Sequence, residues 1–186
     1  MPAPTHITLH WPTEAACAAS AVRLAESLRA AAGLHDAFIE LHGPLGAGKT
    51  TFVRHLLHAL GVQGRVKSPT YAVVEEYEVD GLASTPLTTT PSAPWHIWHF
   101  DFYRFDDPQE WEDAGFRDVF ASPGLKLAEW PEKAEGLLPQ ADLRIDIDAA
   151  IDVGADADAN ADDAAVNLPR VARFTALSAR AAELLK

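Results

Sequence analysis

The sequence has a single cysteine, no long apolar run and no surplus of basic residues. Cys17 therefore cannot form an intramolecular disulfide, and among its alanine neighbours it is expected to be a small buried apolar side chain. No stretch of about 18 apolar residues is present that would cross a membrane. The first residues, MPAPTHITLHWP, lack the basic and apolar parts of a signal peptide. We expect a cytoplasmic protein with no membrane partner.

Basic residues are scarce, since lysine and arginine total 15 against 27 aspartates and glutamates, for a net charge of −12. The negative electrostatic field of such a chain repels the phosphate backbone of nucleic acids, and the composition offers no basic surface to bind it. Any RNA is therefore expected to be held mainly by a partner. Part of the acidity is local, because residues 145–169 contain seven aspartates and no lysine or arginine.

The length of 186 residues, with 48% hydrophobic and 23% charged residues, suits one globular domain. No internal repeat is visible. The stretch 81–94 is rich in Ser, Thr and Pro, and the stretch 149–169 is rich in Ala and Asp. Neither composition supports a packed core. We predict a single domain over residues 1–186 with loop insertions at 81–94 and 149–169.

Hydrophobic periodicity predicts alternating strands and helices. A helix capped by Thr13 is expected to end near Gly33, a buried strand follows at 37–42, and a second amphipathic helix runs from Thr50 to Gly61. Later strands are predicted at 71–79, 97–105, 125–129, 143–147 and 170–177, with a helix at 107–120 and a terminal helix to Leu185.

Residues 43–50, Gly-Pro-Leu-Gly-Ala-Gly-Lys-Thr, match the phosphate-loop pattern G-x-x-x-x-G-K-[ST]. Glycines let backbone N–H groups point at the phosphates, Lys49 places its charge between the β- and γ-phosphates, and the Thr50 hydroxyl ligates Mg²⁺. A chance glycine turn is the alternative, but a buried strand precedes the loop and an amphipathic helix follows it, as the motif requires. The predicted loop contacts to nucleotide are Gly43, Leu45, Gly46, Ala47, Gly48, Lys49, Thr50 and Thr51.

Three sequence strings are missing, and their absence bears on which nucleotide is bound and on which class of ATPase this is. The guanine-specific string N/T-K-x-D and the switch string D-x-x-G do not occur, which favours ATP over GTP. The string LSGGQ is also missing, which argues against a transporter ATPase.

Four strings occur in order along the chain: GAGKTT at 46–51, VKSPTY at 66–71, HFDFYR at 99–104 and EWP at 129–131. Together they resemble the TsaE (YjeE) family over about residues 13–148. The resemblance implies a P-loop ATPase that acts with TsaD and TsaB proteins in making threonylcarbamoyladenosine beside the anticodon of tRNAs. The two insertions depart from the family pattern, which bears on partner contacts more than on ATP binding.

Two acidic residues are candidates for magnesium chemistry. Alternation along 97–105 puts His99 and Asp101 on one face, and the resemblance brings Asp101 to the site, where it would hold Mg²⁺ through water or orient the attacking water. The alternative is that Asp101 pairs with Arg104 or caps a loop. Glu129 ends a strand where the ligand crevice of an α/β sheet opens, and with Thr50 it would complete the Mg²⁺ shell. A solvated glutamate near Lys133 is the alternative.

Ser68-Pro-Thr-Tyr71 follows the nucleotide helix, where P-loop proteins often place a switch that senses the γ-phosphate. Thr70 is the predicted sensor, although a plain turn would look the same, and Lys67 is equally placed for phosphate or solvent. Glu14 and Arg170 resemble family positions that contact the nucleotide away from its phosphates, with solvent exposure as the alternative.

The predicted fold is a three-layer α/β P-loop fold with a mostly parallel sheet, binding ATP and Mg²⁺. The predicted catalytic residues are Lys49, Asp101, Glu129 and Thr70, and the metal ligands are Thr50, Glu129 and Asp101. One alternative function is a small kinase, although no basic lid segment is visible. The other is an ATP-sensing adaptor that does not hydrolyse ATP.

Overall fold

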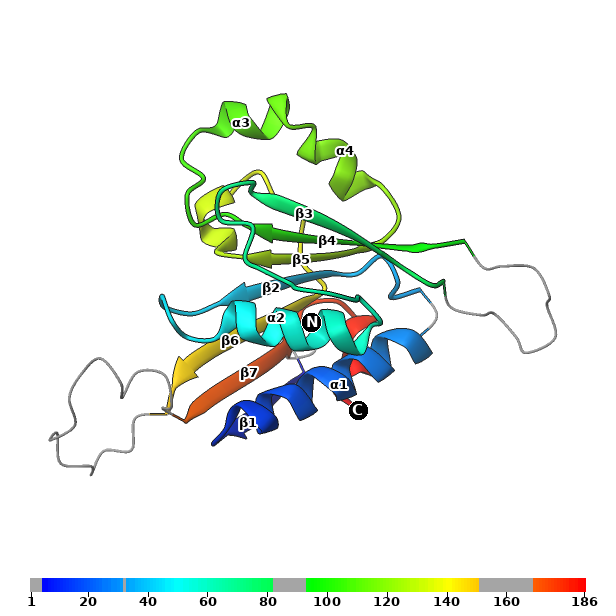
Figure 1. Cartoon of the computed structure of the whole chain (residues 1–186), viewed down its shortest axis with the longest axis vertical. Coiled ribbons are helices and arrows are strands. Elements are labelled where there is room, and N and C mark those ends of the chain that lie inside the picture. The colour runs from blue at the N-terminus through cyan, green and yellow to red at the C-terminus, as the bar shows by residue number, and fades with distance from the viewer. Residues whose placement is uncertain (1–4, 32, 82–92, 151–168) are drawn as a thin grey trace, which may run out of the picture.

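The computed structural model describes residues 5–31, 33–81, 93–150 and 169–186 (Figure 1). The predicted insertions at 81–94 and 149–169 fall mostly outside these residues. Among the described helices, none has the length and apolar character needed to span a bilayer.

A seven-stranded sheet organises the described chain, with strand order β1-β7-β6-β2-β5-β4-β3. The four strands β6, β2, β5 and β4 run parallel to one another, while β3, β7 and β1 each run antiparallel to their neighbours. The predicted α/β fold is confirmed, with the parallel pairing concentrated at the centre. The strands are β1 (His6–Trp11), β2 (Phe38–His42), β3 (Val74–Val79), β4 (Trp95–Asp101), β5 (Leu125–Glu129), β6 (Leu143–Ala149) and β7 (Arg170–Ala176).

Helices cover both faces of this sheet and make three layers (Figure 1). Helices α1 (Glu14–Ala30) and α2 (Lys49–Ala59) pack together over one face. The short helices α3 (Pro108–Asp113) and α4 (Phe116–Ala121) cover the other. Alternation along β4 sends Ile97 into the first core and Trp98 and Phe100 into the second. Because both faces are covered, β5 is buried along its whole length.

Several predicted boundaries are confirmed. The Thr13 hydroxyl accepts a hydrogen bond from Ala16 N–H at 3.3 Å and caps α1. The strand at 125–129 has the predicted limits, and α2 ends just before Gly61, whose φ is +102°. Cys17 is buried, and burial raises the pKa of its thiol to about 12, with the Glu14 charge adding to the shift.

Three predicted elements are wrong in extent. The helix at 107–120 is two helices, because Gly115 adopts a left-handed conformation with φ +69° between them. The strand at 71–79 begins only at Val74, after Val73 turns the chain with φ +65°. The strand at 97–105 stops at Asp101, whose carboxylate accepts the N–H of Tyr103 and so turns the backbone.

The edges of the sheet differ most from prediction. Strand β1 was not predicted, and the terminal helix is a short 3-10 turn, η2 (Ala181–Leu185). Just before η2, Arg180 donates from Nε to Asp142 Oδ1 at 2.7 Å and from Nη2 to Oδ2 at 2.6 Å. Asp142 also accepts from Phe38 N–H at 3.1 Å. This ion pair ties the C-terminal segment to the start of β2.

Candidate functional site

The phosphate loop joins β2 to α2 with its glycines in conformations that other residues avoid. Gly43 has φ +140°, and a Cβ there would collide with the carbonyl oxygen of Ile147 on β6. Gly48 has φ +105° immediately before α2 begins at Lys49. Because the first N–H groups of a helix have no partner within it, the start of α2 offers donors and a positive dipole end to an anion.

The Lys49 side chain lies within the loop rather than in solvent, with 4% of its surface exposed. Its ammonium donates to Gly43 O at 2.6 Å and Pro44 O at 3.0 Å, and it sits 3.8 Å from the ring centroid of Trp130. Burial lowers the pKa of Lys49, while the nearby charges of Glu129, Glu132 and Asp101 oppose that shift. A buried cation of this kind is well suited to compensating phosphate charge.

The carboxylate of Glu129, at the end of β5, has a hydrogen-bond partner at each of its two oxygens. Its Oε2 accepts the Thr50 hydroxyl at 2.8 Å, and its Oε1 lies 2.8 Å from His99 Nε2. Both Glu129 and His99 are buried, with 2% and 0% exposed surface. The two contacts fix the rotamer of the carboxylate beside the first turn of α2.

Asp101, at the end of the adjacent β4, binds the predicted switch segment. Its Oδ2 accepts the hydroxyl of Thr70 at 2.7 Å and the hydroxyl of Ser68 as well, and these two hydroxyls lie 2.6 Å apart. Asp101 is paired in register with Glu129 on the parallel strand β5. The two carboxylates therefore stand side by side at one edge of the sheet.

These groups line one hollow of about 390 Å³, which we name the phosphate-loop hollow. Most of the predicted site residues line it. Its lining is Leu45, Gly46, Ala47, Gly48, Lys49, Thr50, Thr51, Ser68, Thr70, Asp101, Tyr103, Arg104, Glu129 and Trp130.

Three predicted nucleotide contacts are not among these lining residues. Gly43 is the first residue of the loop, and its carbonyl oxygen accepts a hydrogen bond from the Lys49 ammonium. Arg170 donates from Nε to Ala47 O at 3.1 Å and from Nη2 to Gly46 O at 3.3 Å, so it braces the loop from β7. Glu14 is largely exposed and lies 3.0 Å from His55 Nε2. Their contact with nucleotide stays a prediction.

Thr50, Asp101 and Glu129 line the phosphate-loop hollow and each carries side-chain oxygen, which is the ligand atom that Mg²⁺ prefers. The donor set therefore fits this cation. A separate group of possible metal ligands in the described chain, Glu76, Glu78 and His96, lies on β3 and β4 away from the phosphate loop. Two of these three side chains are exposed acids, which need no metal.

The sequence patterns assigned no role in the site to His99, Tyr103, Arg104 or Trp130. The period-2 pattern did put His99 and Asp101 on one face, and the pairing of β4 with β5 then brings His99 to Glu129. The contact of Trp130 with Lys49 depends on φ +58° at Trp130, which no residue pattern announces. Arg104 stacks over the Tyr71 ring at 4.4 Å, next to the switch segment.

The chain matches a family model and named relatives from bacteria. The family model described as "Threonylcarbamoyl adenosine biosynthesis protein TsaE" matches residues 11–155. A Haemophilus influenzae protein named tRNA threonylcarbamoyladenosine biosynthesis protein TsaE is 46% identical over 110 residues, which are 59% of this chain and 61% of that protein. The namesake from Bacillus subtilis is 37% identical over 133 residues, covering 68% of this chain and 75% of that protein. The match with the Haemophilus relative thus spans less than two thirds of that relative's length.

Among solved structures, that of YdiB from Bacillus subtilis has a TM-score of 0.63 with this chain at 24% sequence identity. The alignment covers 100% of this chain and 95% of YdiB. At this level of identity the likeness establishes a shared fold.

Proposed function

This chain belongs to the TsaE family of threonylcarbamoyl adenosine biosynthesis proteins, and from that premise we propose that it binds MgATP in the phosphate-loop hollow and hydrolyses it. The observation that carries this proposal is the convergence of a buried lysine, two buried carboxylates and three threonines on one hollow at the start of α2. Each of these group types has a place in phosphoryl transfer, and chance assembly of all of them around a phosphate-loop sequence is improbable.

The residues of the phosphate-loop hollow would have different roles in ATP binding, according to their charge and position. Lys49 and the N–H groups at the start of α2 would compensate the charge of the β- and γ-phosphates. The Thr50 hydroxyl and the Glu129 carboxylate would hold Mg²⁺, which supplies positive charge to the transferred phosphoryl group. The existing Thr50 to Glu129 hydrogen bond, at 2.8 Å, already keeps the two oxygens together.

Asp101 would accept a hydrogen bond from the attacking water and orient it toward the γ-phosphate. In the described structure its Oδ2 is shared by the hydroxyls of Ser68 and Thr70. The switch segment and the water-orienting group are thereby joined through one oxygen atom. A change at the γ-phosphate would alter these hydrogen bonds and move residues 68–71, which is how the nucleotide state would reach a partner surface.

We further propose that the protein works in the cytoplasm with TsaD and TsaB partners in tRNA threonylcarbamoyladenosine biosynthesis. Support comes from family membership and from the names of the Haemophilus and Bacillus relatives. The net charge of −12 favours contact with tRNA only through the complex. Hydrolysis by the protein alone is expected to be slow, and partners are expected to accelerate it.

The test is a steady-state ATPase assay of the wild type and Lys49→Ala, each alone and with TsaD and TsaB. We expect the wild type to release phosphate faster in the presence of partners, and Lys49→Ala to lose nucleotide affinity with little change in the melting temperature of the nucleotide-free protein. Phosphate release that stays at zero with partners present would instead favour an ATP-sensing adaptor. Unchanged ATP affinity in Lys49→Ala by calorimetry would refute the phosphate-loop assignment.

A further inference from the structure

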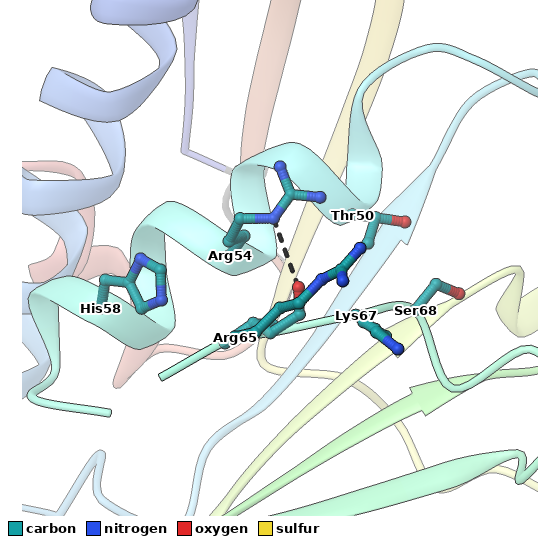
Figure 2. A pocket seen from close by; sticks show the side chains of 7 residues that line it. Thr50, Arg54, His58, Arg65, Lys67 and Ser68 are labelled. Carbon is teal, nitrogen blue, oxygen red and sulfur yellow. Dashed lines mark hydrogen bonds between the residues drawn. The ribbon is translucent and has the colours of Figure 1, made fainter. Parts of the chain in front are cut away.

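A second hollow, of about 440 Å³, opens between α2 and the stretch of chain that follows it. Figure 2 shows its side chains rising from the helix on one side and from the extended stretch 65–68 on the other. We name it the basic hollow, because its lining includes two arginines and a lysine but no aspartate or glutamate. The lining residues are Thr50, Arg54, His58, Arg65, Val66, Lys67 and Ser68.

In the part of the chain that the structure describes, the three cations of the basic hollow form no ion pair, and the carboxylates of Asp101 and Glu129 instead accept hydrogen bonds from the lining hydroxyls of Ser68 and Thr50. Arginines elsewhere in the chain do form ion pairs. The chain carries 27 acidic against 15 basic residues, so a cluster of three cations without a carboxylate runs against its overall composition. Like charges that share a hollow repel one another, and a bound anion relieves that repulsion.

Two of the lining side chains are held in place by backbone carbonyls. Arg54 Nε donates to Val66 O at 3.4 Å, which engages one of the five N–H groups of its guanidinium (Figure 2). His58 Nε2 lies 3.0 Å from Gly64 O, and since a carbonyl only accepts, this nitrogen carries the proton. The remaining donors of Arg54, together with those of Arg65 and Lys67, are available to a ligand at the wall of the hollow.

We propose that the basic hollow is a phosphate-binding site and that it receives the inorganic phosphate produced by ATP hydrolysis. Guanidinium and ammonium groups bind phosphate oxygens by charge-assisted hydrogen bonds, and paired guanidinium donors match the spacing of two such oxygens. This inference rests on the proposed ATPase function. In that reaction water adds to the γ-phosphorus and the bond from that phosphorus to the bridging oxygen breaks. One water proton stays on the phosphate and the other passes to solvent, leaving ADP in the phosphate loop and free hydrogen phosphate beside it.

The position of the basic hollow favours this source. Thr50 and Ser68 line both the basic hollow and the phosphate-loop hollow, so the two are neighbours that share a wall. Ser68 also donates to Asp101, the residue expected to orient the attacking water. A phosphate that leaves the γ-position past these two hydroxyls enters a cation-lined space. A nucleic-acid backbone is a weaker candidate, because a polyanion meets the field of the whole chain, whose net charge is −12.

The test titrates inorganic phosphate into protein that is already saturated with Mg²⁺ and ADP, with binding followed by calorimetry and by phosphorus NMR. Three proteins are compared: the wild type, the double variant Arg65→Gln/Lys67→Gln, and the control Arg117→Gln. Arg65 and Lys67 are exposed, so the double variant is expected to fold, and circular dichroism checks this. Arg117 lies on α4, which covers the opposite face of the sheet. The substitution Arg117→Gln therefore removes a positive charge far from either hollow.

We expect one phosphate to bind wild type and Arg117→Gln equally, and the double variant to bind about tenfold more weakly, since it loses two exposed cationic contacts. Equal affinity in all three proteins, or no phosphate binding to the wild type, would overturn the proposal. A parallel titration with a short single-stranded RNA separates the sources. Tighter binding of RNA than of phosphate, with the same loss in the double variant, would also overturn the assignment to product phosphate.

The phosphate titration requires no turnover, so it separates this inference from the proposed function. If the wild type binds phosphate as expected but never hydrolyses ATP, the hydrolysis proposal is refuted. The claim that the bound phosphate is the product of hydrolysis is then refuted as well. If ATP is hydrolysed and phosphate does not bind, only the present inference is refuted. In a hydrolysing wild type, a fluorescent phosphate sensor should also report slower release in the double variant than in Arg117→Gln at equal rates of cleavage.

Discussion

Replacing Glu129 with glutamine removes one negative charge from the phosphate-loop hollow while preserving the size of the side chain. Glu129 is 2% exposed and makes two hydrogen bonds of 2.8 Å, to the Thr50 hydroxyl and to His99 Nε2. The glutamine oxygen can keep one of these contacts, and its amide can donate to the other partner if the His99 ring changes tautomer. We therefore expect the stability of the nucleotide-free protein to change by about 1 kcal/mol or less.

The rate of ATP hydrolysis should be affected by Glu129→Gln much more strongly than the stability, and it should fall. Glu129 is the carboxylate that accepts the Thr50 hydroxyl, and loss of one positioned electrostatic group in an active site typically costs about 10²-fold or more in rate. The affinity for ATP without Mg²⁺ should stay the same or rise, because one negative charge near the phosphates is gone.

Glu132→Gln is the matched control. The charges of Glu129 and Glu132 both act on Lys49, but Glu132 is half-exposed and does not line the phosphate-loop hollow. The assay measures ATPase rate, calorimetric affinity with and without Mg²⁺, and urea unfolding for both variants. If Glu129→Gln hydrolyses ATP as fast as Glu132→Gln, or if the Glu129 carboxylate lies more than about 6 Å from Mg²⁺ in a nucleotide-bound structure, the assignment is wrong.

Three further predictions follow from other contacts. Asp142→Asn should destabilise the protein at pH 7 by about 2 kcal/mol, after allowance for the partial exposure of Arg180. Burial raises the pKa of Asp142, but its hydrogen bonds and the Arg180 charge together lower it below the ordinary value. The stabilisation is therefore full above about pH 4 and is lost as the pH falls further, so urea midpoints of wild type and variant should converge in acid. His99→Gln should lower the ATPase rate about tenfold and alter its Mg²⁺ dependence, because Glu129 loses a positioning contact; a structural role alone would leave the Mg²⁺ dependence unchanged. Arg170→Gln should weaken ATP binding by a few-fold in calorimetry, since the loop loses its brace from β7, and equal affinity would contradict that role.

The sequence was sufficient for the elements that build the site. The phosphate-loop pattern, the strand before it and the helix after it are local features, and their period and glycines determine one arrangement. Alternation within 97–101 was enough to separate Asp101 from Phe100 onto opposite faces of β4. The strand end and the family resemblance were enough to nominate Asp101 and Glu129 for the site, but their side-by-side position comes from the pairing of β4 with β5.

Other features depend on contacts between distant segments. The alternation of Ile7, Leu9 and Trp11 is a strand signal, but an edge strand is recognisable only once β7 is known to be its partner. The break at Gly115 and the turn at Val73 require positive φ values that composition does not specify. The basic hollow combines Arg54 on α2 with Arg65 and Lys67 eleven or more residues later, and only the fold brings them together.

The most direct test of the central claim, that MgATP turnover at Lys49, Thr50, Asp101 and Glu129 serves tRNA modification, is a reconstituted threonylcarbamoyladenosine assay. TsaD, TsaB, tRNA, ATP and the activated threonylcarbamoyl donor are combined with no added protein, with the wild type, or with Lys49→Ala. We predict that only the wild type sustains repeated rounds of modification, with the yield of modified tRNA exceeding the amount of partner complex. An equal multiple-turnover yield in all three reactions would contradict the account.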